Sequence, residues 1–335
     1  MVQSVRDSYP RYTEFDDSPG SAHNLVVGLV EPSSHVLEFG CATGYMSRVL
    51  RDRLGATVVG VELNAEAAQM AAAHSDRVLV GDAEELDLEA ELGGARFDAI
   101  LFADVLEHLR DPAALLKRVR PLVAEGGVVI ASIPNVAHAS VRLALLGGAF
   151  RYREQGLLDE GHLRFFTREG IQDLFESSGY LITQWLRRRL EVEESEITVP
   201  SSVPEEARAW ATGDSEATTY QFVVSAVPSE PAAQLHAWRT ELEEARDELD
   251  RLRPVAAEVE LLRAELEELR PLRGTDEELQ ALRRAHETLQ RRLVAERAAF
   301  AEGIASVEES VYGTRSWRYT APIRGAIRTL RKLKP

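Results

Sequence analysis

The sequence predicts an α/β protein with a doubly wound, mostly parallel sheet, followed by an α-helical coiled coil. Over residues 1 to about 228, short β-branched runs alternate with helical patterns. This alternation is typical of a parallel sheet covered by helices on both faces. Residues about 229–310 are instead rich in Glu, Leu, Arg and Ala, and their leucines follow a heptad spacing.

The order of elements is predicted from short apolar runs and from helix caps. Asn64 and Thr167 are good N-cap residues, and Asp111 before Pro112 has the order of a helix start. The expected parallel strands are Val36–Phe39, Thr57–Leu63, Val78–Val80, Phe97–Ala103 and Val128–Ile133. The expected helices are Tyr45–Leu54, one from Asn64, one from Asp111 that ends at Gly126-Gly127, and Thr167–Ser178.

Two more strands are expected after these elements, Leu181–Leu190 and Thr218–Val227, with no clear helix between them. Strands that follow each other without a crossover helix pair antiparallel. The sequence therefore predicts an antiparallel hairpin at one edge, which completes a seven-stranded sheet.

Composition excludes several classes of protein. The formal net charge of −16 at pH 7 disfavours general binding of nucleic acid, because phosphates would repel the chain. The single cysteine, Cys41, excludes an internal disulfide and a cysteine-based zinc cluster. The N-terminus lacks the apolar segment of a signal peptide, and no apolar run has the length of a membrane span. We therefore expect a cytoplasmic protein that binds no nucleic acid.

The loop after the first strand reads Glu38-Phe-Gly-Cys-Ala-Thr-Gly44 and precedes a helix. In this context backbone N–H groups and the helix N-terminus face a ligand, and small residues at Gly40 and Ala42 let it approach the backbone. A dinucleotide fingerprint needs glycine or alanine where this chain has Tyr45. The acid at the start of the loop also fits a cationic ligand better than a pyrophosphate.

This loop resembles the acid-x-Gly-x-Gly-x-Gly motif of the class I S-adenosylmethionine-dependent methyltransferases, with Ala42 in place of the middle glycine. The resemblance covers residues about 33–185 and implies a Rossmann-like fold with S-adenosylmethionine as cofactor. It implies that Glu62 takes both ribose hydroxyls, Asp82 the adenine amino group, and Asp104 the methionine end. The implied cofactor-binding residues are Glu38, Gly40, Ala42, Gly44, Glu62, Leu63, Asp82, Ala83, Asp104 and Tyr12, the last in a segment 1–30 that closes over the cofactor.

Methyl transfer requires an aligned acceptor and often the removal of its proton, and two histidines are candidates for this role. The first is His108, which shares a face with Asp104 if a helical turn starts there. This stretch resembles the quinone-biosynthesis O-methyltransferases, which implies Asp104, Glu107 and His108 as an alternative site for a divalent cation. We favour a His108 that packs near the cofactor without metal, because the same pattern occurs across this fold without one.

The second candidate is His162, in the segment 157–167 between the fifth strand and the next helix. A loop in this place lies over the acceptor side of the pocket in this fold. There His162 is a candidate general base, with Asp159 orienting its ring, or else His162 and Arg164 only pin the loop. Asn135, after the fifth strand, is placed to hydrogen-bond an acceptor.

The predicted coiled coil is segmented. Its apolar positions run from Leu235 in steps of 3 and 4, and the seam is interrupted near Pro254 and Pro271 before a last stretch, 279–300. We expect a homo-oligomer or a coiled-coil partner bound through 235–300. A helical hairpin that folds back on the enzyme is the alternative.

The tail at 311–335 carries seven Arg and Lys and no acid. Its aromatic and aliphatic residues, interleaved with these cations, predict a basic amphipathic element. Such an element can contact the inner face of an anionic membrane, or it can dock on the acidic coiled coil.

The predicted organisation is therefore a capping segment 1–30, a methyltransferase domain 31–228, a coiled coil 229–310 and a basic tail 311–335. The 157–167 segment and the tail resemble methyltransferases encoded with bacterial glycan-assembly and glycosyltransferase proteins. This resemblance implies a small-molecule or saccharide substrate, methylated on a sugar hydroxyl. Two alternatives stay open: a metal-assisted O-methyltransferase of an aromatic or quinone-type metabolite, and a coiled-coil scaffold whose cofactor fold is vestigial.

Overall fold

The computed structural model describes residues 14–230, part of 240–264, and 276–312, the last with side chains over 280–299. The chain divides into two units, 1–234 and 235–335. Three sets of predictions lie outside the described residues: the role of Tyr12 in the capping segment, the basic tail from 313 onward, and much of the predicted coiled-coil seam before 276, including Leu235 and Pro271.

The first unit is built on a seven-stranded sheet with the order β3-β2-β1-β4-β5-β7-β6. Strands β3, β2, β1, β4 and β5 run parallel, and β7 pairs antiparallel with both β5 and β6. The strands are β1 His35–Phe39, β2 Thr57–Glu62, β3 Arg77–Val80, β4 Phe97–Ala103, β5 Val123–Pro134, β6 Tyr180–Arg189 and β7 Thr219–Pro228. The predicted fold class, including the antiparallel edge, is confirmed.

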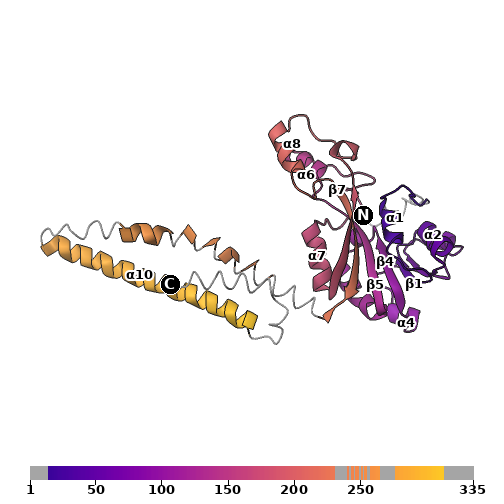
Figure 1. The fold of residues 1–335 in the computed structure, drawn as a ribbon, viewed down its shortest axis with the longest axis horizontal. Helices are drawn as coiled ribbons and strands as arrows, with labels where there is room; N and C mark the ends of the chain where they lie inside the picture. The colour runs from indigo at the N-terminus through magenta and orange to yellow at the C-terminus, as the bar shows by residue number, and fades with distance from the viewer. Residues whose placement is uncertain are drawn as a thin grey trace. The chain divides into compact units, whose positions relative to one another are not determined.

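Helices cover both faces of this sheet, as Figure 1 shows. On one face, α1 and α2 pack against residues such as Val36 and Val223. On the other face, α4, α5 and α7 pack against Phe39, Phe102 and Phe222. The helices are α1 Ala22–Val27, α2 Tyr45–Leu54, α3 Ala65–Ala71, α4 Leu88–Leu92, α5 Pro112–Val119 and α7 Arg168–Ser177.

A smaller layer with apolar clusters of its own follows β5. It contains α6 (Ala139–Leu146), the 3₁₀ turn η3 (Val192–Glu194) and α8 (Glu205–Thr212). The prediction of no helix between the last two strands is therefore wrong. Helix α8 escaped detection because it buries only Ala211 while Trp210 is 74% exposed, so its sequence lacks a clear apolar stripe.

The end of α5 was also predicted wrongly. The helix ends at Val119, and the 3₁₀ turn η2 (Arg120–Leu122) leads directly into β5. Gly126 and Gly127 lie inside β5, where the register with β4 shifts, rather than at the end of a helix. The pairing of Val123 with Phe97 already starts the strand before the glycines.

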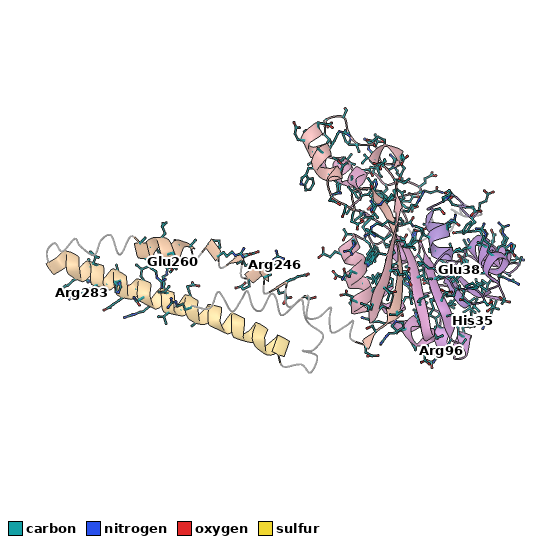
Figure 2. The ribbon with its side chains drawn as sticks, viewed as in Figure 1. His35, Glu38, Arg96, Arg246, Glu260 and Arg283 are labelled. Carbon is teal, nitrogen blue, oxygen red and sulfur yellow. The ribbon has the colours of Figure 1, made fainter. Side chains whose placement is uncertain are left out.

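The second unit consists of helical segments within 240–264 and the long helix α10 (Asp276–Tyr312). Among the described side chains of 280–299, Leu282, Leu289 and Leu293 are half-buried and the others are exposed, including Arg283 (Figure 2). These three leucines are members of the predicted apolar seam. The partner of that seam stays a prediction.

No helix in the described part of the chain is long and apolar enough to cross a membrane.

Candidate active site

The loop between β1 and α2 turns tightly in a left-handed backbone conformation. Gly40, Ala42 and Gly44 have φ angles of +65°, +48° and +80°. A Cβ atom on Gly40 would lie 2.7 Å from Cγ2 of Val105, and one on Gly44 would lie 2.8 Å from Cα of Ala71. Gly40 and Gly44 are therefore favoured both by their left-handed backbone and by the lack of room for a side chain. Ala42 also has a positive φ angle, and its methyl group fits at the place of the middle glycine.

Glu38 lies at the carboxyl end of β1, in the first unit (Figure 2), and is buried. The hydroxyl of Ser47 donates a hydrogen bond to its carboxylate over 2.5 Å. Burial, together with the negative charge of Glu62, raises the pKa of Glu38 to about 7. A cation bound beside this carboxylate would therefore be stabilised by it.

Glu62 ends β2 and braces the loop. One carboxylate oxygen accepts the N–H of Ala42 over 2.9 Å, and the other accepts the N–H of Asn64 over 2.8 Å. This arrangement fixes the carboxylate at the carboxyl edge of the sheet. Leu63 follows it and is exposed.

Asp82 and Ala83 follow β3, the next strand along the sheet. The carboxylate of Asp82 accepts the N–H of Glu84 over 2.8 Å and lies 3.3 Å from the guanidinium of Arg110. The acids after β1, β2 and β3 thus share one edge of the parallel sheet, where ligands bind in this class of fold. A glycine turn surrounded by acids fits a cationic adenosyl ligand.

Asp104 follows β4, at the boundary between this acidic edge and the β5–β7 side of the sheet. Its φ angle is +55°, and Oγ of Ser132 accepts its N–H over 3.0 Å. The side-chain amide of Gln221 donates to its carboxylate. Burial raises the pKa of Asp104 to about 6, although hydrogen bonds and the charge of Arg188 oppose the change. Ser132, Gln221 and Arg188 were not predicted, because they come from the distant strands β5, β7 and β6.

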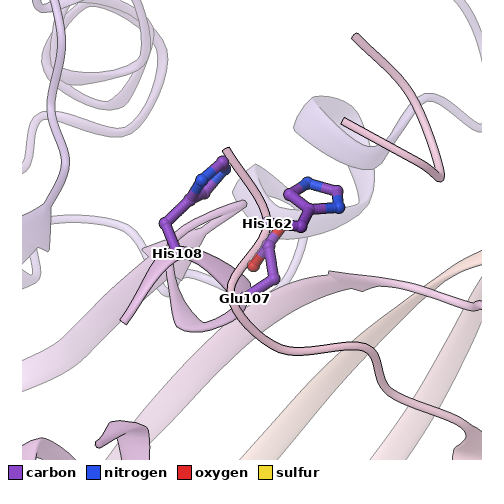
Figure 3. Close-up of side chains that lie close together, drawn as sticks. All are labelled: Glu107, His108 and His162. Carbon is purple, nitrogen blue, oxygen red and sulfur yellow. The ribbon is translucent and has the colours of Figure 1, made fainter. Parts of the chain in front are cut away.

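The two histidines that were predicted as separate candidates lie together (Figure 3). His108 ends the 3₁₀ turn η1 (Leu106–His108), and its ring centroid is 4.8 Å from that of His162. Ligand atoms of Glu107, His108 and His162 all lie within 4.8 Å of one another. The backbone N–H groups of Leu163 and Arg164 donate to the carbonyl of Glu107, and so dock the loop on η1.

These three residues are called the Glu107–His108–His162 cluster below. Burial lowers the pKa of His108, and burial plus the neighbouring His108 lower the pKa of His162 to about 4. Both imidazoles are therefore neutral at pH 7. Burial raises the pKa of Glu107 well above its ordinary value, and the charge of Asp104 adds to this.

The other two predicted catalytic residues are engaged within the fold. The carboxylate of Asp159 accepts the N–H of Gly161 over 2.6 Å, and its backbone carbonyl accepts the N–H of His162. Asn135 is buried, donates to the carbonyl of Thr219 over 2.8 Å, and accepts the N–H of Ala137. Asp159 thus shapes the turn that carries His162, and the amide of Asn135 braces the start of the smaller layer.

The chain is similar to a known protein family and to several named proteins. A family model described as a methyltransferase domain matches residues 11–184 of the chain. The chain belongs to this methyltransferase family. Its cofactor is S-adenosylmethionine.

Curated relatives carry the name ubiquinone biosynthesis O-methyltransferase. The protein from Xanthomonas campestris pv. campestris is 30% identical over an alignment of 171 residues, and the match covers 47% of this chain and 70% of the relative. The protein from Cereibacter sphaeroides is 32% identical over 148 residues, 43% of this chain and 59% of the relative.

Solved structures are similar in fold. Magnesium protoporphyrin IX methyltransferase from Synechocystis, with bound S-adenosylhomocysteine, is 16% identical, with a TM-score of 0.46 over 68% of this chain and 100% of that one. A possible histamine N-methyltransferase from Thermotoga maritima is 20% identical, with a TM-score of 0.43 over 62% of this chain and 87% of that one.

Proposed function

We propose that the methyl acceptor is a hydroxyl oxygen and that the Glu107–His108–His162 cluster activates it. The observation that carries this proposal is the pair of neutral imidazoles beside the buried Glu107, just beyond the carboxyl end of β4. A hydroxyl needs help in losing its proton, whereas a neutral amine does not. Burial keeps both imidazoles neutral at pH 7, so a ring nitrogen with a lone pair is available to accept the proton.

The reaction balances with these groups. The oxygen attacks the methyl carbon in line, a C–O bond forms, and the S–C bond breaks with its electron pair going to sulfur. The hydroxyl proton goes to a neutral imidazole of the cluster, and the sulfonium becomes a neutral thioether. His162 belongs to the loop that docks on η1.

Aromatic side chains next to the cluster support an acceptor with an aromatic or apolar body. The ring centroid of Phe165 lies 6.1 Å from that of His162, and Phe150 packs against both Phe165 and Tyr152. All three aromatic residues are partly or largely exposed, so their faces are available to a ligand. The relatives' name, which refers to ubiquinone biosynthesis, agrees with such an acceptor. A sugar hydroxyl remains a prediction from the sequence.

The test is methyl transfer from labelled S-adenosylmethionine by the full chain to matched acceptors: catechols, simple sugars, and amines. We expect turnover of a hydroxyl acceptor, and loss of turnover in His162→Ala with unchanged binding of S-adenosylhomocysteine. His286→Ala, an exposed histidine of α10, is the control. Transfer to amines but to no hydroxyl would overturn the proposal.

We also propose that α10 and the helical segment before it mediate self-association or bind a helical partner. The spacing of Leu282, Leu289 and Leu293 supports this, because they lie on one side of the helix at steps of 7 and 4. Light scattering on the full chain and on Leu289→Lys tests it. An unchanged mass for this variant, together with unchanged helicity, would contradict a role of the seam.

A further inference from the structure

We propose that the Glu107–His108–His162 cluster is a binding site for one divalent transition-metal ion of the Zn²⁺ or Co²⁺ type, with His162 as the third ligand. The metal site implied by family resemblance uses Asp104 instead. The binding of the ion does not depend on the acceptor, whereas its use in the reaction rests on the proposed function.

The donor atoms are already gathered. Each of the three residues offers one ligand atom, and these atoms lie within 4.8 Å of one another. Glu107 and His108 come from η1, and His162 comes from a loop that is fastened to η1 through the carbonyl of Glu107 (Figure 3). Small movements of side chains would bring three ligands around one ion, because the backbone that carries them is held in place.

The carboxylate of Glu107 is the strongest reason to expect an ion. Glu107 is 1% exposed, and within the described part of the chain neither of its carboxylate oxygens has a hydrogen-bond partner. Buried polar atoms without partners are rare, since each costs free energy in the folded state. A cation between Glu107 and the two imidazoles would take the place of the carboxyl proton and give one of these oxygens a partner.

The histidines present one free nitrogen each. Nδ1 of His108 lies 3.0 Å from the carbonyl of Gly161, which can only accept, so this nitrogen carries the proton and Nε2 keeps its lone pair. A hydrogen bond from the ring of His162 to the backbone of Leu157 opposes the lowering of its pKa and so occupies one ring nitrogen. A backbone carbonyl that orients the second ring nitrogen is the usual support of a metal-binding histidine.

The donor set indicates the kind of ion and the ligands that bind it. Two imidazoles and one carboxylate suit Zn²⁺, Co²⁺ or Ni²⁺, whereas Mg²⁺ prefers oxygen ligands. Asp104 is not part of the set, because its carboxylate is hydrogen-bonded by Gln221 and Ser132. Three protein ligands leave a coordination position open, as in catalytic sites. When bound, such an ion would supply Lewis-acid activation of the acceptor hydroxyl, and the imidazoles would then act as ligands.

The test is titration of the metal-free full chain with Co²⁺, followed by visible absorption, with metal content after dialysis measured by mass spectrometry. We expect one equivalent with a ligand-field spectrum in the wild type. Glu107→Gln and His162→Ala should each weaken Co²⁺ binding by more than about 100-fold, because loss of an outer-shell partner alone costs about 10- to 100-fold and these variants remove a ligand. Asp104→Asn and the control His286→Ala should bind as the wild type does.

Each result has a defined meaning. Absence of Co²⁺ binding by the wild type, or loss in Asp104→Asn with retention in His162→Ala, would overturn the proposal. Binding of S-adenosylhomocysteine by each variant shows that it is folded, and His108→Gln provides a second variant if His162→Ala does not fold. Co²⁺ binding with methyl transfer that is insensitive to chelators would keep the site and refute only its role in the reaction. Absence of methyl transfer with intact Co²⁺ binding would instead refute the proposed function.

Discussion

Glu38→Gln should make the cofactor-free protein more stable at alkaline pH and weaken cofactor binding. Glu38 is buried, and its pKa is raised from 4.5 to about 7. A carboxyl group whose pKa is raised by folding favours the folded state below its unfolded pKa, and this contribution is lost as the pH rises through the folded pKa. Ionised Glu38 therefore destabilises the fold at pH 8, and glutamine removes this effect while its amide oxygen can still accept the Ser47 hydroxyl.

The magnitude follows from the pKa difference. A difference of about 2.5 units corresponds to about 3 kcal/mol at pH 8. At pH 5 it corresponds to less than about 1 kcal/mol, because the group is protonated in the folded state and the unfolded pKa of 4.5 lies only just below this pH. In a domain of this size, about 3 kcal/mol raises the Tm by about 6 to 12 °C.

Differential scanning calorimetry of the wild type and Glu38→Gln at pH 5 and pH 8, without ligand, measures this effect. Glu31→Gln, at an exposed position, is the matched control. Calorimetric titration with S-adenosylhomocysteine at pH 8 should show weaker binding by Glu38→Gln. A variant that is less stable than the wild type at pH 8, or that shifts the Tm equally at both pH values, would refute the reasoning.

Three further predictions concern the core, the loop and the cluster. Phe175→Ala, at a fully buried position, should lower the free energy of unfolding by about 3 to 5 kcal/mol in urea titrations. Gly44→Ala should abolish measurable binding of S-adenosylhomocysteine in calorimetry, because its Cβ atom would lie 2.8 Å from Cα of Ala71. In metal-free protein, protonation of His162 should leave the methyl-transfer rate unchanged between pH 6 and 8. The rate should fall as the pH approaches about 4, the pKa of His162.

Each of these has a contrary outcome. A loss below about 1 kcal/mol for Phe175→Ala would mean that the site is not tightly packed. Wild-type affinity in Gly44→Ala would mean that the loop is not the cofactor turn. A rate that falls already near pH 6.5 would show a histidine with an unshifted pKa as the proton acceptor.

Local sequence was sufficient for the sheet and for the acidic edge. The apolar runs fix the parallel strands, and the topology of such a sheet places Glu38, Glu62 and Asp82 at the ends of adjacent strands. Their common edge therefore follows from strand order alone. The helix α8 did not follow, because its apolar stripe is reduced to one buried alanine, Ala211.

The acceptor side depends on contacts between distant segments. His162 meets His108 because two N–H groups of its loop bond the carbonyl of Glu107, and a backbone contact of this kind leaves no pattern in the sequence. The pairing of Gln221 with Asp104 is equally remote, since it joins β7 to the end of β4. The residues at this side were thus recognised by type, and their grouping required the structure.

The central claim is that the cofactor lies along the β1–β3 edge with its sulfur directed at the Glu107–His108–His162 cluster. A crystal structure of the full chain with S-adenosylhomocysteine and Co²⁺ tests it most directly. The account predicts the ribose at Glu62, the sulfur on the side of Asp104 that faces the cluster, and anomalous density for Co²⁺ between Glu107, His108 and His162. A sulfur directed away from the cluster, or cobalt bound at Asp104 without His162, would contradict it.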